Sequence, residues 1–88
     1  MPTARFIVNG KVQGVFYRAS TREQALALGV GGYAENRRDG GVEVLATGSA
    51  QALDALERWL WQGPPMAVVD AVSRQDLPEQ ELQGFRIG

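Results

Sequence analysis

A hairpin signal near the middle of the chain constrains the fold more than any other feature. Asp39-Gly40 lies between two candidate strands, residues 30–36 and 41–47, and side chains of the second stretch divide between two faces. An Asp-Gly pair between two such stretches favours two antiparallel strands joined by a tight turn. In the second stretch the residues that share one face are Val42, Val44 and Ala46. We therefore predict a strand pair here with one buried face.

Further strands are predicted on either side of this hairpin. Residues 4–12 place Ala4, Phe6 and Val8 on one face, which is typical of a half-buried strand. Residues 67–74 predict a fourth strand, residues 77–83 a loop, and residues 85–87 a short last strand.

Two helices are predicted between the strands. Residues 20–23, "STRE", form a capping-box pattern in which Ser20 and Glu23 would satisfy the free amides at a helix start. Helical spacing continues through Thr21, Ala25 and Leu28, and Gly29 is a natural helix stop. Ser49 is the predicted cap of a second helix, which "GPP" at 63–65 would end. The apolar stripe of that helix is Leu53, Leu56 and Leu60.

The resulting order is βαββαβ with a short C-terminal strand, in 88 residues that form one predicted domain, 1–88. This order predicts an α+β, ferredoxin-like sandwich, with a mainly antiparallel sheet and two helices on one face. Many unrelated functions use this fold, so the fold alone does not indicate an activity.

Composition excludes several kinds of chemistry. The chain has no His and no Cys, which excludes thiolate nucleophiles, phosphohistidine chemistry and most zinc sites. Its net charge is −1, so it lacks the basic surface typical of nucleic-acid-binding proteins. No signal peptide and no apolar run of about 20 residues is present. We expect a cytoplasmic monomer that binds neither nucleic acid nor membranes.

The stretch "GKVQGVFYR", residues 10–18, joins the first predicted strand to the first helix. Helix starts carry free backbone amides and the positive end of the helix dipole, which suit an anion. Gly14 allows the chain to turn amides inward, and Arg18 adds a planar fork of donors that matches phosphate oxygens. The loop therefore predicts a cradle for phosphate or sulfate. It is not a Walker loop, because Val12 stands where that motif needs Ser or Thr.

The same stretch closely resembles the signature of the acylphosphatase family, which hydrolyses carboxyl–phosphate anhydrides. Residues 31–48, "GGYAENRRDGGVEVLATG", resemble the second signature of the family, in which a strand ends in Asn before a turn. "GP" at 63–64, "AVVDAV" and the closing "FRI" also fit, so the resemblance spans nearly the whole chain.

This resemblance implies specific roles for residues of the chain. The catalytic Arg of the family falls on Arg18 and its catalytic Asn on Asn36. The backbone that binds phosphate falls on Gln13, Gly14, Val15, Phe16, Tyr17 and Arg18. The chain departs from the family pattern at Tyr33, where Trp is common, and at Glu35, where Arg is common. Taken alone, Asn36 beside Asp-Gly is more typical of a turn former.

The residue types agree with the implied reaction. Arg18, backbone amides and Asn36 include no strong general acid or base, so they suit a substrate whose leaving group needs no proton. An acyl phosphate releases a carboxylate, whose acid has a pKa of about 4. We therefore expect hydrolysis of a small acyl phosphate without metal or cofactor. Inorganic phosphate, the product, is expected to inhibit.

Three other functions remain open from the residues. The same cradle could serve a non-catalytic module that binds a carboxyl or carbamoyl phosphate inside a larger enzyme. An RNA-recognition module shares the βαββαβ order but needs exposed aromatics on its central strands, where this chain offers only Phe6 on the apparent core face. A regulatory domain that binds a small molecule would not explain Arg18 together with Asn36.

Overall fold

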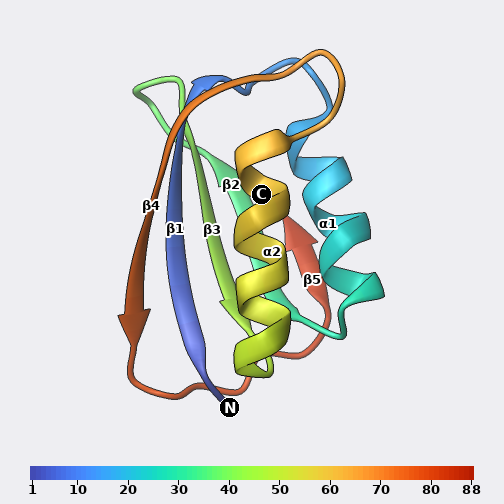
Figure 1. The fold of residues 1–88 in the computed structure, drawn as a ribbon, viewed down its shortest axis with the longest axis vertical. Coiled ribbons are helices and arrows are strands. Elements are labelled where there is room, and N and C mark those ends of the chain that lie inside the picture. The colour runs from blue at the N-terminus through green and yellow to red at the C-terminus, as the bar shows by residue number, and fades with distance from the viewer.

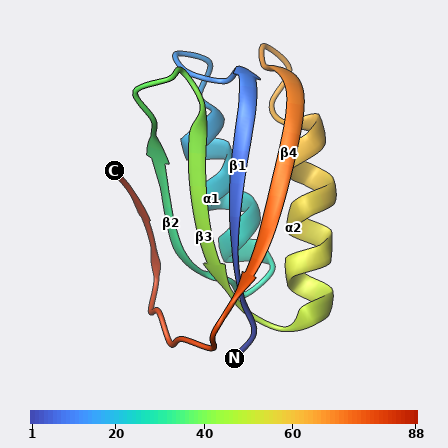
Figure 2. The ribbon, with the colours of Figure 1, turned by 90° about the vertical axis from the view of Figure 1, so that its left-hand side faces the viewer.

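The computed structural model describes residues 1–88, which form five strands and two helices. Their order and bounds are β1 (Thr3–Lys11), α1 (Tyr17–Ala27), β2 (Gly31–Asn36), β3 (Val42–Thr47), α2 (Ala50–Gln62), β4 (Val68–Leu77) and β5 (Phe85–Ile87). The strands make one sheet in the order β4-β1-β3-β2-β5, and both helices cover the same face of it (Figures 1 and 2). The predicted ferredoxin-like α+β fold is confirmed. No helix is both long enough and apolar enough to span a bilayer.

Strand direction brings two connecting segments to one end of the sheet. β1 and β2 both pair with β3 in antiparallel fashion, so β1 and β2 run in the same direction and finish at the same end of the sheet. The loop after β1 and the turn after β2 therefore lie at the same end of the molecule (Figure 2). β4 is antiparallel to β1, and only β5 adds a parallel pair, with β2. The sheet is thus mainly antiparallel, as predicted.

The core lies between the sheet and the helices. The predicted inward positions of the first strand and of the second hairpin strand are fully buried, which confirms the predicted alternation of buried and outward side chains. The apolar stripe of α2 belongs to the same buried cluster. These buried residues are Ala4, Phe6, Val8, Val42, Val44, Ala46, Leu53, Leu56 and Leu60. Phe6, the only aromatic residue of the two central strands, is inaccessible, so these strands offer no exposed ring for base stacking.

β4 is an edge strand that charged side chains protect. It runs to Leu77, three residues beyond the predicted end, because its pairing with β1 continues to Thr3. None of its residues is fully buried. Arg74 contacts Asp54 and Glu57 of α2, each at 2.8 Å, and Asp76 of its own strand at 3.0 Å. Charges along an edge strand discourage pairing with other chains.

The predicted capping box at residues 20–23 is wrong. α1 begins at Tyr17, one turn earlier, and its N-cap is Phe16. The Ser20 amide already donates to the Phe16 carbonyl at 3.0 Å, so Ser20 lies inside the helix and caps nothing. The predicted stop is confirmed, since Gly29 has a φ of 71° directly after the C-cap Leu28. The Ser49 cap of α2 is confirmed as well, with the Ala52 amide donating to its Oγ at 3.0 Å.

Candidate active site

The loop between β1 and α1 has the backbone conformation of an anion-binding nest. Gly14 and Phe16 both have left-handed φ values, 73° and 62°. Left-handed residues next to right-handed ones turn successive amides toward one point. The amides of residues 13–16 donate no hydrogen bond within the protein. Gly14 and Phe16 are exposed, so these amides are accessible to a ligand that accepts hydrogen bonds.

The first turn of α1 adds further free donors to this loop. Phe16 is the N-cap, but its side chain makes no capping hydrogen bond. A helix start has about four amides without an internal partner and the positive end of the dipole. The left-handed conformation costs a bulky residue about 1–2 kcal/mol. An uncapped helix start behind a strained residue is the arrangement expected where a ligand takes the place of the cap.

Tyr17 anchors this helix start to the second helix. Its hydroxyl donates to the Leu60 carbonyl at 2.6 Å, and the residue is almost fully buried. Within a helix that carbonyl would accept from residue 64, but Pro64 has no amide hydrogen. The hydroxyl thus satisfies a carbonyl at the end of α2. Burial raises the pKa of Tyr17 well above its usual range, so the phenol stays neutral.

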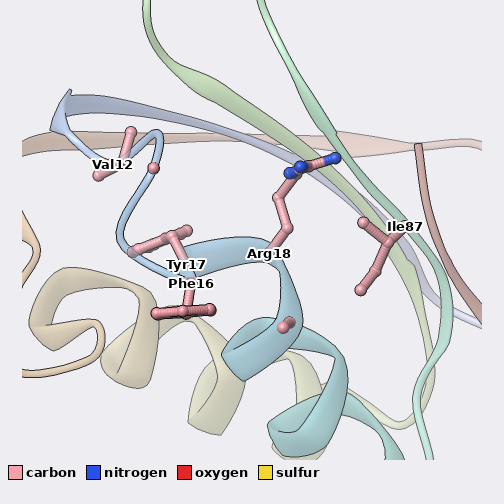
Figure 3. A pocket seen from close by; sticks show the side chains of 7 residues that line it. Val12, Phe16, Tyr17, Arg18 and Ile87 are labelled. Atoms are coloured by element: carbon pink, nitrogen blue, oxygen red, sulfur yellow. The ribbon is translucent and has the colours of Figure 1, made fainter.

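Arg18 projects from the first turn of α1 into the cavity beside the loop (Figure 3). Its Nη1 donates to the carbonyl oxygen of Gly88, and Gly88 is held in turn by its amide, which donates to the Ala34 carbonyl at 2.9 Å. The guanidinium is therefore held in place through Nη1, while its other donors form no hydrogen bond within the protein. A planar fork fixed in this way is suited to bidentate contact with an oxyanion.

The cavity has a volume of about 330 Å³. Its walls are Val12, Gly14, Phe16, Tyr17, Arg18, Ala19 and Ile87. No carboxylate is among these residues, and Tyr17 is neutral, so the guanidinium of Arg18 supplies the only side-chain charge of the wall. A cavity with free amides and one fixed positive charge favours a small anion.

The structure separates the predicted loop residues into different roles. Gly14, Phe16, Tyr17 and Arg18 line the cavity, whereas the side chain of Val15 turns into the core. Gln13 points its side chain toward the β2–β3 turn, and its Nε2 donates to the carbonyls of that turn.

Two residues near Arg18 were missed from the sequence. Ile87 of β5 lies beside the Arg18 side chain in Figure 3, and Gly88 accepts the hydrogen bond of Arg18. The alternation in residues 85–87 gave a signal for Ile87, since Phe85 is buried and Ile87 follows on the same face. Nothing in the sequence indicated that Gly88 would contact Arg18, because Gly88 contributes only its backbone oxygen.

Asn36 ends β2 at the same edge of the sheet as this loop. Its side chain is exposed and makes no hydrogen bond within the protein. Strand alternation places Asn36 on the face of buried Ala34, which is the face covered by the helices. Glu35 therefore lies on the open face, opposite Asn36, where its side chain is next to Gly88. Asn36 is near the loop without being part of the cavity wall.

The β2–β3 turn holds this end of the strand. Arg37 donates its amide to the Gly41 carbonyl at 2.8 Å, and Asp39 Oδ1 accepts from the Gly41 amide at 2.9 Å. That bond, with help from Arg37, lowers the pKa of the Asp39 carboxyl. The predicted hairpin and the predicted turn role of Asp39 are confirmed.

Comparisons with known proteins agree along the whole chain. The sequence pattern of the Acylphosphatase family matches residues 4–87. A protein named acylphosphatase from Xanthomonas oryzae pv. oryzae is 68% identical over 88 residues, which cover all of both chains. The crystal structure of an acylphosphatase from Bacillus subtilis has a TM-score of 0.96 and 34% identity, over 100% of this chain and 99% of that one.

The same fold also occurs as a small part of a larger protein. The crystal structure of T. kodakarensis HypF matches all of this chain with a TM-score of 0.86 and 27% identity, but the match covers only 12% of that protein. By contrast, the match to the Xanthomonas protein covers all of that protein as well as all of this chain. With the family pattern and a full-length relative in agreement, the chain belongs to the acylphosphatase family of hydrolases.

Proposed function

We propose that this enzyme hydrolyses the carboxyl–phosphate bond of a small acyl phosphate and releases a carboxylate and inorganic phosphate. The observation that carries the proposal is the group of free amides in residues 13–16, which stands beside the fixed guanidinium of Arg18. These donors would surround the phosphoryl group and stabilise the charge on its oxygens. Family membership supports the same substrate class. The monomeric state, the single domain and the cytoplasmic location stay predictions.

The leaving group explains why so few catalytic groups are needed. Cleavage of the P–O bond leaves the electron pair on a carboxylate oxygen, whose acid has a pKa of about 4. Such a group departs without a proton. The reaction accordingly needs no general acid, and the one phenol of the wall, Tyr17, already donates its proton to the Leu60 carbonyl. An alkyl phosphate would release an alkoxide and would need a proton or another electrophile, so acyl phosphates suit this wall better than ordinary monoesters do.

Asn36 would orient the attacking water. An amide side chain can accept a hydrogen bond from water and donate one to a phosphoryl oxygen, and this side chain is free for both. The water oxygen forms the new bond to phosphorus as the bond to the carboxylate breaks. The proton of the water passes to an oxygen of the phosphoryl group, so no separate base is required. Positioning of this kind accounts for most catalysis of phosphoryl transfer.

The direct test is phosphate release from benzoyl phosphate in the presence of EDTA. We expect turnover well above the rate of spontaneous hydrolysis, with the same kcat and KM whether or not the chelator is present. The same enzyme should be at least about a hundredfold less active on an alkyl phosphate such as glycerol 3-phosphate, because that leaving group lacks a proton donor. A preparation that binds benzoyl phosphate without hydrolysing it would contradict the proposal. Activity that EDTA abolishes and a divalent cation restores would contradict its metal-free form.

A further inference from the structure

Gln13 connects the two parts of the site through its side chain. Its Nε2 donates to the Arg37 carbonyl at 2.8 Å and to the Gly41 carbonyl at 2.9 Å. These carbonyls lie 24 and 28 residues further along the chain. A primary amide has two N–H donors, and both are used here. Gln13 is also the only polar side chain of residues 12–16, so no other side chain of the loop can make such bonds.

The two carbonyls stand at the base of the β2–β3 turn. Arg37 follows Asn36 directly, and Gly41 precedes Val42, which is the cross-strand partner of Asn36. The amide of Arg37 donates to the carbonyl of Gly41, so the two residues whose carbonyls accept from Gln13 are themselves joined. Gln13 therefore holds both ends of the turn, one residue away from the Asn36–Val42 pair.

The side chain of Asn36 has no hydrogen bond of its own that could fix its position. Its side chain is exposed and unpaired, so its distance from the cradle is set by the backbone that carries it. The backbone of Gln13 belongs to the cradle loop, while its side chain holds the turn beside Asn36. A displacement of about 1 Å in a group that positions a reactant can cost about a hundredfold in rate.

We propose that the Gln13 side chain is a positioning residue that fixes the distance between the phosphate cradle and Asn36. This side chain contacts neither the substrate nor the attacking water, and it acts on the reaction only through the position of Asn36. The proposal rests on the proposed function, in which the cradle holds the phosphoryl group and Asn36 orients water. Gln13 then makes two separate contributions. Its backbone amide belongs to the cradle, and its side chain holds the β2–β3 turn in place.

The test is a double-mutant cycle of Gln13→Met and Asn36→Ala with benzoyl phosphate. Met has nearly the size of Gln but no N–H donor. We expect Gln13→Met to lower kcat by about tenfold to a hundredfold, with less than about a twofold change in KM and in inhibition by phosphate. In the Asn36→Ala background the same substitution should change kcat by less than about twofold, because the residue it positions is absent. Gln13→Asn, which keeps the amide but is one methylene shorter, should behave like Gln13→Met.

Rates are taken per folded molecule, well below the melting temperature of each variant. Gln51→Met, on the exposed side of α2, is the matched control and should leave kcat unchanged. An equal loss of kcat with and without Asn36, or a native kcat in Gln13→Met, would overturn this proposal while the native enzyme remained active. A collapse of phosphate affinity would also overturn it, because Gln13 would then belong to the cradle. An inactive native enzyme would instead overturn the proposed function itself, and this proposal with it.

Discussion

Arg18→Lys should remove nearly all activity and leave the fold intact. Lys keeps the positive charge but replaces the planar fork with a flexible ammonium group, whose donors diverge from one nitrogen and cannot reproduce the parallel pair of the guanidinium. Loss of one well-placed donor to a developing oxyanion costs about a hundredfold to a thousandfold in kcat, or about 3–4 kcal/mol. We expect a loss in this range, together with weaker inhibition by phosphate. The measurements are kcat, KM and the inhibition constant of phosphate.

The matched control is Arg22→Lys, at an exposed position one turn further along α1. It makes the same chemical change away from the cavity and should leave kcat unchanged. Circular dichroism and thermal melts would show that both variants fold. If Arg18→Lys turned over benzoyl phosphate at a near-native rate, the role proposed for its guanidinium would be wrong.

Asn36→Ala should lower kcat by about a hundredfold or more, about 3 kcal/mol, with little change in KM. Water orientation matters chiefly in the transition state, so its loss should hardly affect substrate binding. Phosphate should still bind, because the loop amides and Arg18 are unchanged. Asn9→Ala, which alters the only other Asn of the chain at an exposed strand position, is the control and should be neutral.

A role of Asn36 in turn formation predicts a different pattern. Its loss would then lower the melting temperature and leave turnover per folded molecule roughly normal. Turnover, phosphate affinity and melting temperature measured on the same variant separate the two roles. Near-native turnover with a clear drop in melting temperature would contradict water positioning.

The fold could be predicted because its signals are local. Alternation in residues 4–12 and 41–47 placed Phe6, Val8 and Val44 in the core, and their burial confirms it. The Asp-Gly pair located the hairpin, and Ser49 located the start of α2. Each of these signals depends on residues a few positions apart, so no knowledge of distant contacts was needed.

The start of α1 was predicted wrongly for a physical reason. "STRE" has the pattern of a capping box, but the helix begins at Tyr17 behind the left-handed Phe16. A side-chain cap at residue 16 would have used up amides of the first helical turn, which this start leaves free. Local rules of helix capping tend to fail where a site needs unsatisfied donors. The failure at residues 20–23 therefore lies directly beside the proposed phosphate cradle.

Contacts between distant segments also could not be predicted. Arg18 donates a hydrogen bond to Gly88, 70 residues away, and Gln13 donates to the carbonyls of the β2–β3 turn. A backbone carbonyl carries no residue-specific signal, so neither Gly88 nor Gly41 could be identified from its residue type. The identities of Arg18 and Asn36 came from the resemblance to a family, while their approach to one edge of the sheet follows from strand direction.

The central claim is that the phosphoryl group binds in the loop before α1. Titration of ¹⁵N-labelled enzyme with inorganic phosphate, followed through backbone amide NMR shifts, tests it most directly. Phosphate should shift the amides of residues 13–18 most, and the dissociation constant should equal the constant for competitive inhibition of benzoyl phosphate hydrolysis. Inhibition that is purely noncompetitive, or shifts concentrated away from residues 13–18, would contradict the claim.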